Sequence, residues 1–420
     1  MVGGPGEAAA SSIVTALNDM KFRSVNIDRR AALALLAATP LGARAQSTDW
    51  ARTTSAARGQ TVYFNAWGGS ERINSYLQWA AAQVSAGFGI QLQHVKLADT
   101  VEMVRRVRAE KAAGRADGSA DLVWINGENF LSMKREGLLF GPFAEQLPNF
   151  RFVDTAGKPT TRIDFSEPVD GMEMPWGMAQ LTFFADRTHL PTPPQSVAEL
   201  TDWARRNPGR FTYPRLPQFH GTTFVKQVWL EHSPDRAALA RPFSEAAFAP
   251  LTAALWRALD ALHPHLWRAG RQFPANPTVM RQMLADGELT ISLTFNPNEA
   301  ANQVASQALP ATVQSWQFSA GTIGNTHFLA IPFNARAKAA AQVVADFLLS
   351  PVAQARKADI RHWGDPTVLA LDLLTPAQRA AFADSAQAPG AVRQPAPTWA
   401  EPHGSWVDPL EREWLRRYGS

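Results

Sequence analysis

Glycine, aromatic and polar residues follow two strand-like segments in the first third of the sequence. The segment 62–65 runs into a Gly-Gly turn and then a helical pattern, and the segment 121–125 runs into a polar turn and a second helical pattern. In open α/β sheets, ligands bind beside the turns that leave the carboxyl ends of the strands. Glycines let the backbone approach a ligand, and the first N–H groups of a helix are free to bind it. The sequence therefore predicts ligand contacts around 67–70 and 124–129.

The elements that would position these turns alternate between strand and helix. Apolar spacing predicts strands at 62–65, 90–97 and 121–125, with helices at 70–86 and 99–114 and a third helix, after the polar turn 126–129, through Phe130, Met133 and Leu138. This βαβαβα order implies a mostly parallel sheet with right-handed crossovers. Capping-box patterns are expected at Asp99–Glu102 and Ser196–Glu199, and Ser350-Pro351 and Thr375-Pro376 should each start a helix.

A second α/β region with its own core is predicted beyond residues 141–170, which read as surface loops. Its expected elements are strands at 181–185 and 289–295 and helices at 225–230, 247–262 and 277–285. An extended segment at 327–331, a helix at 335–349 and a terminal helix within 401–420 are expected after this region. Trp406 and Trp414 are expected to pack that last helix onto the body of the protein. At 420 residues the chain is long enough for two to three folded units.

Composition narrows the class of protein. The formal charge is 41 − 37 = +4, and without residues 1–45 it is 36 − 34 = +2, which argues against a nucleic-acid binder. The chain has no cysteine, so it has no disulfide, thiolate metal site or lipid-modified cysteine. His263-Pro264-His265 is the one close histidine pair, and it is expected in a surface loop rather than at a metal.

The first 45 residues have the pattern of an export signal. Arg29-Arg30 precedes a short apolar run, 31–38, and Ala43-Arg44-Ala45 offers a cleavage site before Gln46. Met20 would be a natural start for such a signal, and either the Sec or the twin-arginine route fits. The apolar run is too short to cross a bilayer, and no later stretch is long enough. A soluble periplasmic protein without a lipid anchor is therefore expected, against the alternative of a buried N-terminal helix.

Three segments resemble a known family. They are V-Y-F-N-A-W-G-G (62–69), M-P-W-G-M-A-Q-L-T-F-F-A-D (174–186), and H-F-L-A-I-P-F-N (327–334) with the helix and L-L-S-P segment that follow it (339–357). Together they resemble extracellular solute-binding proteins of ABC importers with type 2 topology, and most of all the YnjB-like subfamily. The resemblance covers roughly residues 55 to 415. No motif in it is specific for one ligand.

The resemblance implies a two-lobed α/β periplasmic-binding-protein fold with the ligand cleft between its lobes. Lobe 1 would comprise 50–178 and 325–370, and lobe 2 would comprise 179–324 and 371–420. A monomer would capture a small solute and deliver it to a permease and its ATPase, without a cofactor, a metal, nucleic acid or catalysis. The cleft residues would be Asn65, Trp67, Gly68, Gly69, Ser70, Trp124, Asn126, Glu128, Trp176, Gln180, Asn296, Asn298, Glu299, Asn325 and His327.

Several of these residues also have a purely structural interpretation. Trp124 lies in an apolar strand, where core packing is the expected role, whereas Trp176 follows a proline in a linker, which favours ligand contact. Glu128 would suit the first turn of its helix, and Asn296 and Asn298 would suit an ordinary turn. His327 alone fits a hydrogen-bonded structural histidine.

Tryptophan faces beside a glutamate favour a cationic or aromatic organic solute, while free N–H groups at 69–70 would suit a carboxylate or phosphate. Two other classes remain open: an exported carboxylate-dependent hydrolase, whose paired acids need not be close in sequence, and the ligand-binding subunit of a periplasmic sensor. No G-x-S-x-G, H-E-x-x-H or P-loop motif is present.

Overall fold

The computed structural model describes residues 41–382 and 388–419. Its contacts divide the chain into two units, Met1–Asp49 and Trp50–Ser420, and the description below concerns the second. Most of the predicted signal region, residues 1–40, lies outside the described residues. Helix α2 (Leu41–Ala57) runs through the predicted cleavage point after Ala45. Within the described ranges, no helix is both long and apolar enough to cross a membrane.

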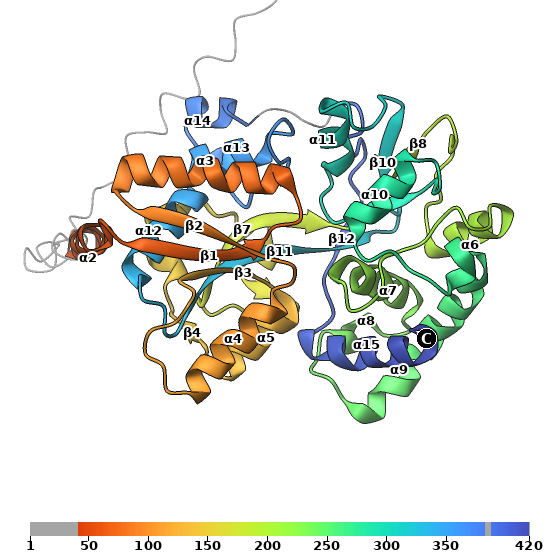
Figure 1. Cartoon of the computed structure of the whole chain (residues 1–420), viewed down its shortest axis with the longest axis horizontal. Coiled ribbons are helices and arrows are strands. Elements are labelled where there is room, and N and C mark those ends of the chain that lie inside the picture. Colours follow the sequence, from red (N-terminus) through yellow and green to blue (C-terminus); the bar gives the residue numbers. More distant parts are fainter. Residues whose placement is uncertain (1–40, 383–387, 420) are drawn as a thin grey trace, which may run out of the picture. The chain divides into compact units, whose positions relative to one another are not determined.

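A mixed sheet with helices on both faces forms the first lobe (Figure 1). Its strand order is β12-β11-β3-β1-β2, with β4 and β7 also paired to β11. The predicted alternation is confirmed for the first six elements, since the parallel strands alternate with helices: β1 (Thr61–Trp67), α3 (Glu71–Phe88), β2 (Gln91–Leu97), α4 (Val101–Ala112), β3 (Leu122–Ile125) and α5 (Gly127–Arg135). The remaining strands of the sheet are β4 (Leu139–Phe140), β7 (Glu173–Gln180), β11 (Thr322–Pro332) and β12 (Thr398–Trp399).

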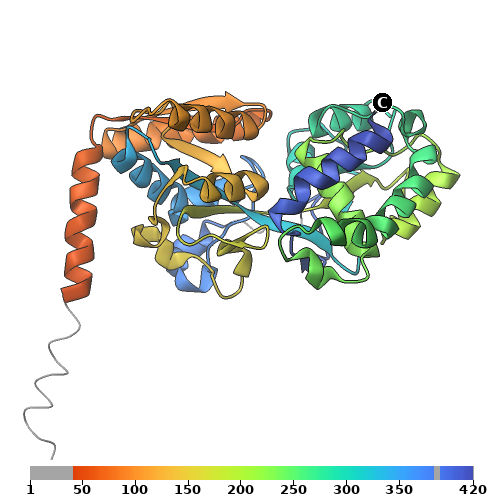
Figure 2. The ribbon, with the colours of Figure 1, turned by 90° about the horizontal axis from the view of Figure 1, so that it is seen from below.

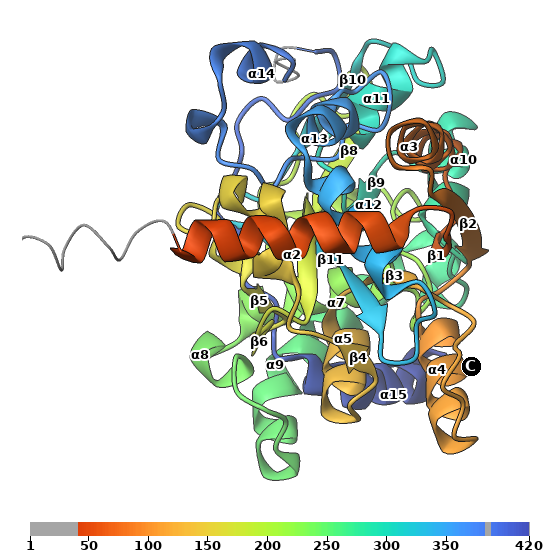
Figure 3. The same cartoon turned by 90° about the vertical axis from the view of Figure 1, so that its left-hand side faces the viewer.

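Alternating side chains of β11 pack into different cores on the two faces of this sheet. Leu329 and Ile331 join the core under α3 and α12 (Lys338–Leu349), whereas Phe328 and Ala330 join the core under α4 and α5. Successive residues of a strand point to opposite faces, so an apolar run buries both. Figure 3 shows α3 and α12 on one side of the strands and α4 and α5 on the other.

Residues 141–170, predicted as loops, contain short elements that pack beside the sheet. They are the 3-10 helices η1 (Ala144–Gln146), η2 (Pro148–Phe152) and η3 (Pro159–Thr161), and a small hairpin of β5 (Ile163–Asp164) and β6 (Glu167–Pro168). Phe165 and Ser166 form the turn of the hairpin, both at positive φ. Non-glycine residues adopt this conformation only where the surroundings hold them there.

The second lobe is built on the three-stranded sheet β10-β8-β9 and a set of helices. Its strands are β8 (Thr182–Asp186), β9 (Ser292–Thr294) and β10 (Val313–Trp316). Its helices are α6 (Val197–Arg206), α7 (Phe219–His232), α8 (Arg236–Leu239), α9 (Glu245–Leu262), η4 (His263–His265), η5 (Trp267–Gly270), α10 (Pro277–Ala285), α11 (Glu299–Ala305), η7 (Gly404–Trp406) and α15 (Val407–Tyr418). As predicted, Trp406 and Trp414 of the terminal segment are buried. His263, predicted in a surface loop, is buried, and its Nε2 lies 2.7 Å from the Tyr213 hydroxyl.

Two long antiparallel strands connect the lobes (Figure 2). Strand β7 pairs with β11 from Gln180–Gly324 to Glu173–Ala330. Ile323 of β11 packs in the core of the second lobe, whereas Leu329 packs in the core of the first. The chain stays with the first core beyond the predicted boundary at residue 370, because Leu374 is part of that core.

The helix starts show which sequence signals were sufficient. As predicted, Ser350 caps α13 (Pro351–Ala358) and Thr375 caps α14 (Pro376–Ala380). Thr375 also forms a complete capping box with Gln378, and η6 (Leu371–Leu373) lies between the two helices. The box predicted at Asp99 is not formed, because its carboxylate accepts the nearer N–H of Val101 instead. At Ser196 only half forms: the Ser196 hydroxyl accepts the N–H of Glu199, while the Glu199 carboxylate accepts the N–H of Gln195.

Candidate functional site

A cavity of about 240 Å³ is lined by side chains from both lobes. The first lobe contributes the turns after β1, β2 and β3 and the segment 363–365. The second contributes the start of α7, the turn after β9, α10 and α15, and the connecting strand β11 adds residues from the middle. The lining therefore includes both turns that the sequence placed at the carboxyl ends of parallel strands.

The structure brings most of the predicted residues together at this cavity. Those that line it are Trp67, Ser70, Trp124, Asn126, Glu128, Asn296, Glu299, Asn325 and His327. Asn126 begins α5 without a side-chain capping bond, so its amide is not used within the helix. Asn325 is 3% exposed, its Nδ2 donates to Glu401 at 2.9 Å, and its Oδ1 has no partner among the described residues.

Four of the predicted polar or glycine residues near the first turn and the crossover have structural roles instead. The side chain of Asn65 is buried and donates to the carbonyl of Tyr63. Gln180 donates to the Thr322 hydroxyl and to the carbonyl of Ala396. A Cβ on Gly68 would lie 2.6 Å from the Lys96 side chain, and one on Gly69 would lie 2.4 Å from the Trp67 ring. Each glycine therefore makes room for a neighbouring side chain, and neither lines the cavity.

Asn298 and Trp176, the remaining two predicted residues, also do not line the cavity. Asn298 donates from Nδ2 to the carbonyl of Gly364 at 2.8 Å, so a neighbouring loop occupies its amide. Trp176, expected to contact the ligand, is completely buried in the first core. The linker that holds it is strand β7, whose residues 173–177 are all buried. The proline before Trp176 therefore lies in a buried strand that pairs with β11, not in an exposed connection.

An aromatic wall in the first lobe rests on Trp176. The rings of Trp124 and Trp363 line the cavity, and their centroids lie 5.1 and 5.2 Å from that of Trp176. Trp363 is roughly stacked on the ring of His327, with centroids 6.2 Å apart and planes at 22°. Trp124 therefore packs against the first core and also lines the cavity, so core packing and ligand contact are not exclusive for this residue.

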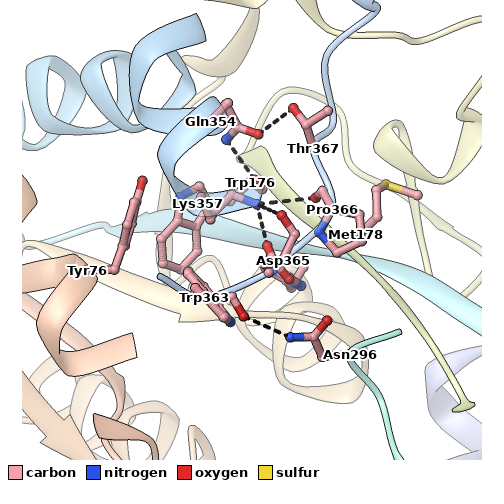
Figure 4. Close-up of polar contacts among 12 residues, drawn as sticks. Tyr76, Trp176, Met178, Asn296, Gln354, Lys357, Trp363, Asp365, Pro366 and Thr367 are labelled. Carbon is pink, nitrogen blue, oxygen red and sulfur yellow. Dashed lines mark hydrogen bonds and ion pairs between the residues drawn. The ribbon is translucent and has the colours of Figure 1, made fainter. Parts of the chain in front are cut away.

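A compensated charge cluster of Asp365, Lys357 and His327 lies beside this wall. Figure 4 shows its Lys357 and Asp365 next to Trp363. Lys357 donates to the Asp365 carboxylate and to the carbonyl of Pro366, and His327 Nε2 lies 3.1 Å from the same carboxylate. Burial opposes ionisation of Asp365, but the charges of His327 and Lys357 hold its pKa below the ordinary value. A Cβ on Gly177 would lie 2.0 Å from the Asp365 carboxylate, so β7 must carry glycine here.

The second lobe contributes a buried cation, Lys226 of α7. Its ammonium lies 2.7 Å from the Glu401 carboxylate and 4.1 Å from the ring centroid of Phe165 in the first lobe. Phe165 in turn lies against Gly127, whose φ of +64 and close contact leave no room for a Cβ. Burial raises the pKa of Glu401, although Lys226 and Asn325 oppose this.

An uncompensated carboxyl pair, Glu128 and Glu411, lines the same end of the cavity. Burial raises the pKa of Glu128 to about 7, with Asp99 and Glu401 adding to the shift and Lys226 opposing it. Burial raises the pKa of Glu411 to about 8, with Glu128 and Asp408 adding to the shift, although the Thr222 hydroxyl donates to it at 2.6 Å and Lys226 also opposes the shift. No described residue forms an ion pair with either, because Lys226 is paired with Glu401. Each carboxylate would therefore gain from a positive charge placed in the cavity.

Sequence reasoning missed many residues that line the cavity, from both lobes: Asp99, Phe219, His220, Lys226, Arg281, Trp363, Asp365 and Glu411. One of these residues, Lys226, could have been found from the sequence. Lys226 lies in the apolar run Phe224-Val225-Lys226-Gln227-Val228-Trp229, and a lysine inside a fully buried helix needs a partner. Burial lowers the pKa of His220 to about 4, so this ring is neutral at the cavity. Arg281 is already paired with Glu299 at 2.7 Å.

The two lobes, the crossover strands and the cavity between them define a protein that encloses a small molecule. Residues 78–377 match the family described as bacterial extracellular solute-binding protein, and the chain belongs to this family. It is 50% identical over 375 residues to Protein YnjB of Escherichia coli (strain K12), covering 89% of this chain and 95% of that one. The predicted family and the predicted solute-binding function are thereby confirmed.

Solved structures of low sequence identity share the fold. The binding protein AfuA from Actinobacillus pleuropneumoniae, with fructose-6-phosphate bound, is 15% identical with a TM-score of 0.58 over 86% of this chain and 99% of its own. The spermidine/putrescine ABC transporter substrate-binding protein PotD from Streptococcus pneumoniae is 13% identical with a TM-score of 0.56 over 85% and 98%. The predicted two-lobed α/β fold is confirmed, and the family places the protein outside the cytoplasm.

Proposed function

We propose that the protein captures a small organic cation between its lobes and delivers it to the permease and ATPase of an ABC importer. The observation that carries the proposal is the uncompensated carboxyl pair, Glu128 and Glu411, at a cavity with aromatic walls. A cation placed there would pair with buried carboxylates and also lie against tryptophan faces, each contact contributing about 0.5–2 kcal/mol.

Charge distribution supports a cation over an anion. The basic side chains in or behind the lining are already paired: Lys226 with Glu401, Arg281 with Glu299, and Lys357 with Asp365. The fold neighbour PotD is named for spermidine and putrescine, which are organic cations, so this fold accommodates such solutes.

The experiment is a thermal-shift measurement on the chain from Gln46 onward. The cationic probes are choline, putrescine and thiamine, and the controls are glucose, sulfate and citrate. At about 100 times the dissociation constant, a bound cation should stabilise the protein by roughly 2.7 kcal/mol. A shift with glucose or sulfate and none with any cation would contradict the proposal.

A carboxylate-dependent hydrolase is the second candidate, because two carboxyl groups with pKa values near 7 and 8 suit acid and base roles. The family is one of solute binding, which supports binding without turnover. Mass spectrometry of each shifting probe after long incubation separates the two functions: an intact probe supports binding, and a cleaved probe supports the hydrolase.

We place the mature protein in the periplasm as a soluble monomer that carries no lipid and is exported by the Sec or the twin-arginine route. Light scattering of the purified chain tests the monomer, and cell fractionation tests the location. Cross-linking in cells distinguishes transport from sensing. An adduct with a multi-span permease supports the importer, whereas an adduct with a receptor would support the sensor.

A further inference from the structure

Three asparagines of the second lobe bind two successive backbone carbonyls of the first lobe. Nδ2 of Asn302 donates to the carbonyl of Trp363 at 2.9 Å, and Nδ2 of Asn296 donates to the same carbonyl at 3.4 Å. Nδ2 of Asn298 donates to the carbonyl of Gly364 at 2.8 Å. A backbone carbonyl can only accept, so these contacts fix which way each amide points. Figure 4 shows Asn296 reaching Trp363 in this way.

The first lobe has room for these amides at Gly364, and it also donates hydrogen bonds to the second lobe. Gly364 has a φ of +80, and a Cβ there would lie 3.0 Å from the Cβ of Asn298. Arg72 of α3 donates from one guanidinium nitrogen to the carbonyl of Asn302 at 3.2 Å and from another to the carbonyl of Arg361 at 2.9 Å. Donors and acceptors therefore alternate across the lobe boundary, and both sides contribute backbone groups.

The asparagines hold the backbone of a residue whose ring lines the cavity. The Trp363 side chain packs on Trp124 and Trp176 at centroid distances of 5.7 and 5.2 Å, and it is 5% exposed. Asn302 is 1% exposed, so its bonds to the first lobe are protected from water. Movement of the second lobe away from the first would break these bonds and release the backbone on which that ring depends.

We propose that Asn296, Asn298 and Asn302 form a latch that joins the closed lobes and, as a set of positioning residues, holds the Trp363 ring in the cavity. Only the part that concerns binding through the ring rests on the proposed function. The latch bonds make no use of a solute, so they favour the closed arrangement whether or not the cavity is filled. A bond that exists in only one of two conformations shifts the equilibrium toward that conformation.

The absence of cysteine makes the latch directly measurable. Spin labels at Gln78→Cys and Arg206→Cys, both exposed, report the distance between the lobes through pulsed electron resonance without competing thiols. In the solute-free protein, the double variant Asn298→Ala/Asn302→Ala should lower the closed-to-open ratio about tenfold, which corresponds to about 1.4 kcal/mol. Gly364→Ala, which disturbs the receiving side, should shift the distances in the same direction.

Asn207→Ala is the matched control, because Asn207 donates from Nδ2 to the carbonyl of Trp203 at 2.9 Å entirely within the second lobe. It should lower the melting temperature without moving the distance distribution. An unchanged distribution in the Asn298→Ala/Asn302→Ala variant and in Gly364→Ala would overturn the latch. Failure of choline, putrescine and thiamine to bind would contradict the proposed function and leave this result intact.

Discussion

The compensated cluster and the uncompensated pair show two different ways of burying charge at one cavity. In the cluster, the Asp365 carboxylate has Lys357 and His327 within bonding distance, so its charge is balanced by the protein itself. In the pair, Glu128 and Glu411 repel each other, and the nearby Lys226 already pairs with Glu401. A balanced buried charge supports the structure, whereas an unbalanced one favours the arrival of an opposite charge. The difference therefore separates the charges that support the cavity from the pair that, in the proposed function, would bind the cation.

The largest effect, a loss of stability, is expected from breaking the compensated charge cluster. Asp365→Asn would leave the Lys357 ammonium buried without its counter-charge, and losing one partner of a buried pair costs about 3–5 kcal/mol in free energy of unfolding. Urea denaturation measures this loss. The control is Asp372→Asn, an exposed carboxylate of the same lobe that should change stability little. Equal effects of the two variants would show that the cluster is not structural.

Neutralising one member of the uncompensated pair should preserve or raise the stability of the fold but weaken the binding of a cation. Glu411→Gln removes a repelled charge, so at pH 8 the free energy of unfolding should stay the same or rise. Affinity for a cationic probe should fall about ten- to a hundredfold, since hydrogen bonds to charged groups contribute about 1.5–3 kcal/mol. Calorimetric titration measures this affinity, with Glu413→Gln on the same helix as control, because that carboxylate pairs outward with Arg416 and Arg417. Unchanged affinity in Glu411→Gln would remove this residue from the site.

The pair should also make binding depend on pH. A cation favours the ionised carboxylates, and the pKa values are about 7 for Glu128 and about 8 for Glu411, so affinity should rise about tenfold between pH 6 and pH 8. The folded state holds these protons more tightly than the unfolded chain, so the contribution of both groups to stability falls as pH rises from about 4.5 to 8. Titrations across this range in the wild type and in Glu128→Gln/Glu411→Gln test both statements. An equally steep pH dependence in that double variant would assign the effect to other groups.

The smallest effect on cation affinity is expected from removing a single aromatic ring, that of Trp67. Trp67 lines the cavity as a partly buried ring, so Trp67→Ala should lower cation affinity about two- to thirtyfold, the range of one cation–π contact of about 0.5–2 kcal/mol. Trp203→Ala, at a partly buried ring of the second core, is the control for general loss of packing. If both variants weaken binding equally, Trp67 has no specific role.

The half of the site that follows parallel strands could be predicted because local sequence fixes it. Trp67, Ser70, Trp124, Asn126 and Glu128 follow two strands of one sheet, and the carboxyl ends of parallel strands lie together. Strand and helix periodicity was therefore enough to bring these residues to one place. The same pattern did not show whether each side chain faces the cavity, as the buried Asn65 illustrates.

The other half depends on contacts distant in sequence. Asp365, Lys226 and Glu411 reach the cavity from a loop, a helix interior and the terminal helix, and only the packing of the lobes brings them together. Trp176 misled for a related reason: its neighbouring proline and glycine indicate a linker, but the strand is buried because Gly177 allows Asp365 and His327 to pack against it. Polar residues such as Asn298 were recognised correctly as turn residues near the cleft, but their partners were not predictable.

Strand β11 has a consequence for how the protein unfolds. All eleven of its residues are buried, and it pairs with strands β3, β4, β7 and β12 while its side chains enter the cores of both lobes. Neither lobe can lose its order without exposing part of a strand that the other lobe also needs. The two lobes, although each has its own core, should therefore melt in one cooperative transition with equal calorimetric and van't Hoff enthalpies, and neither should persist alone after proteolytic removal of the other.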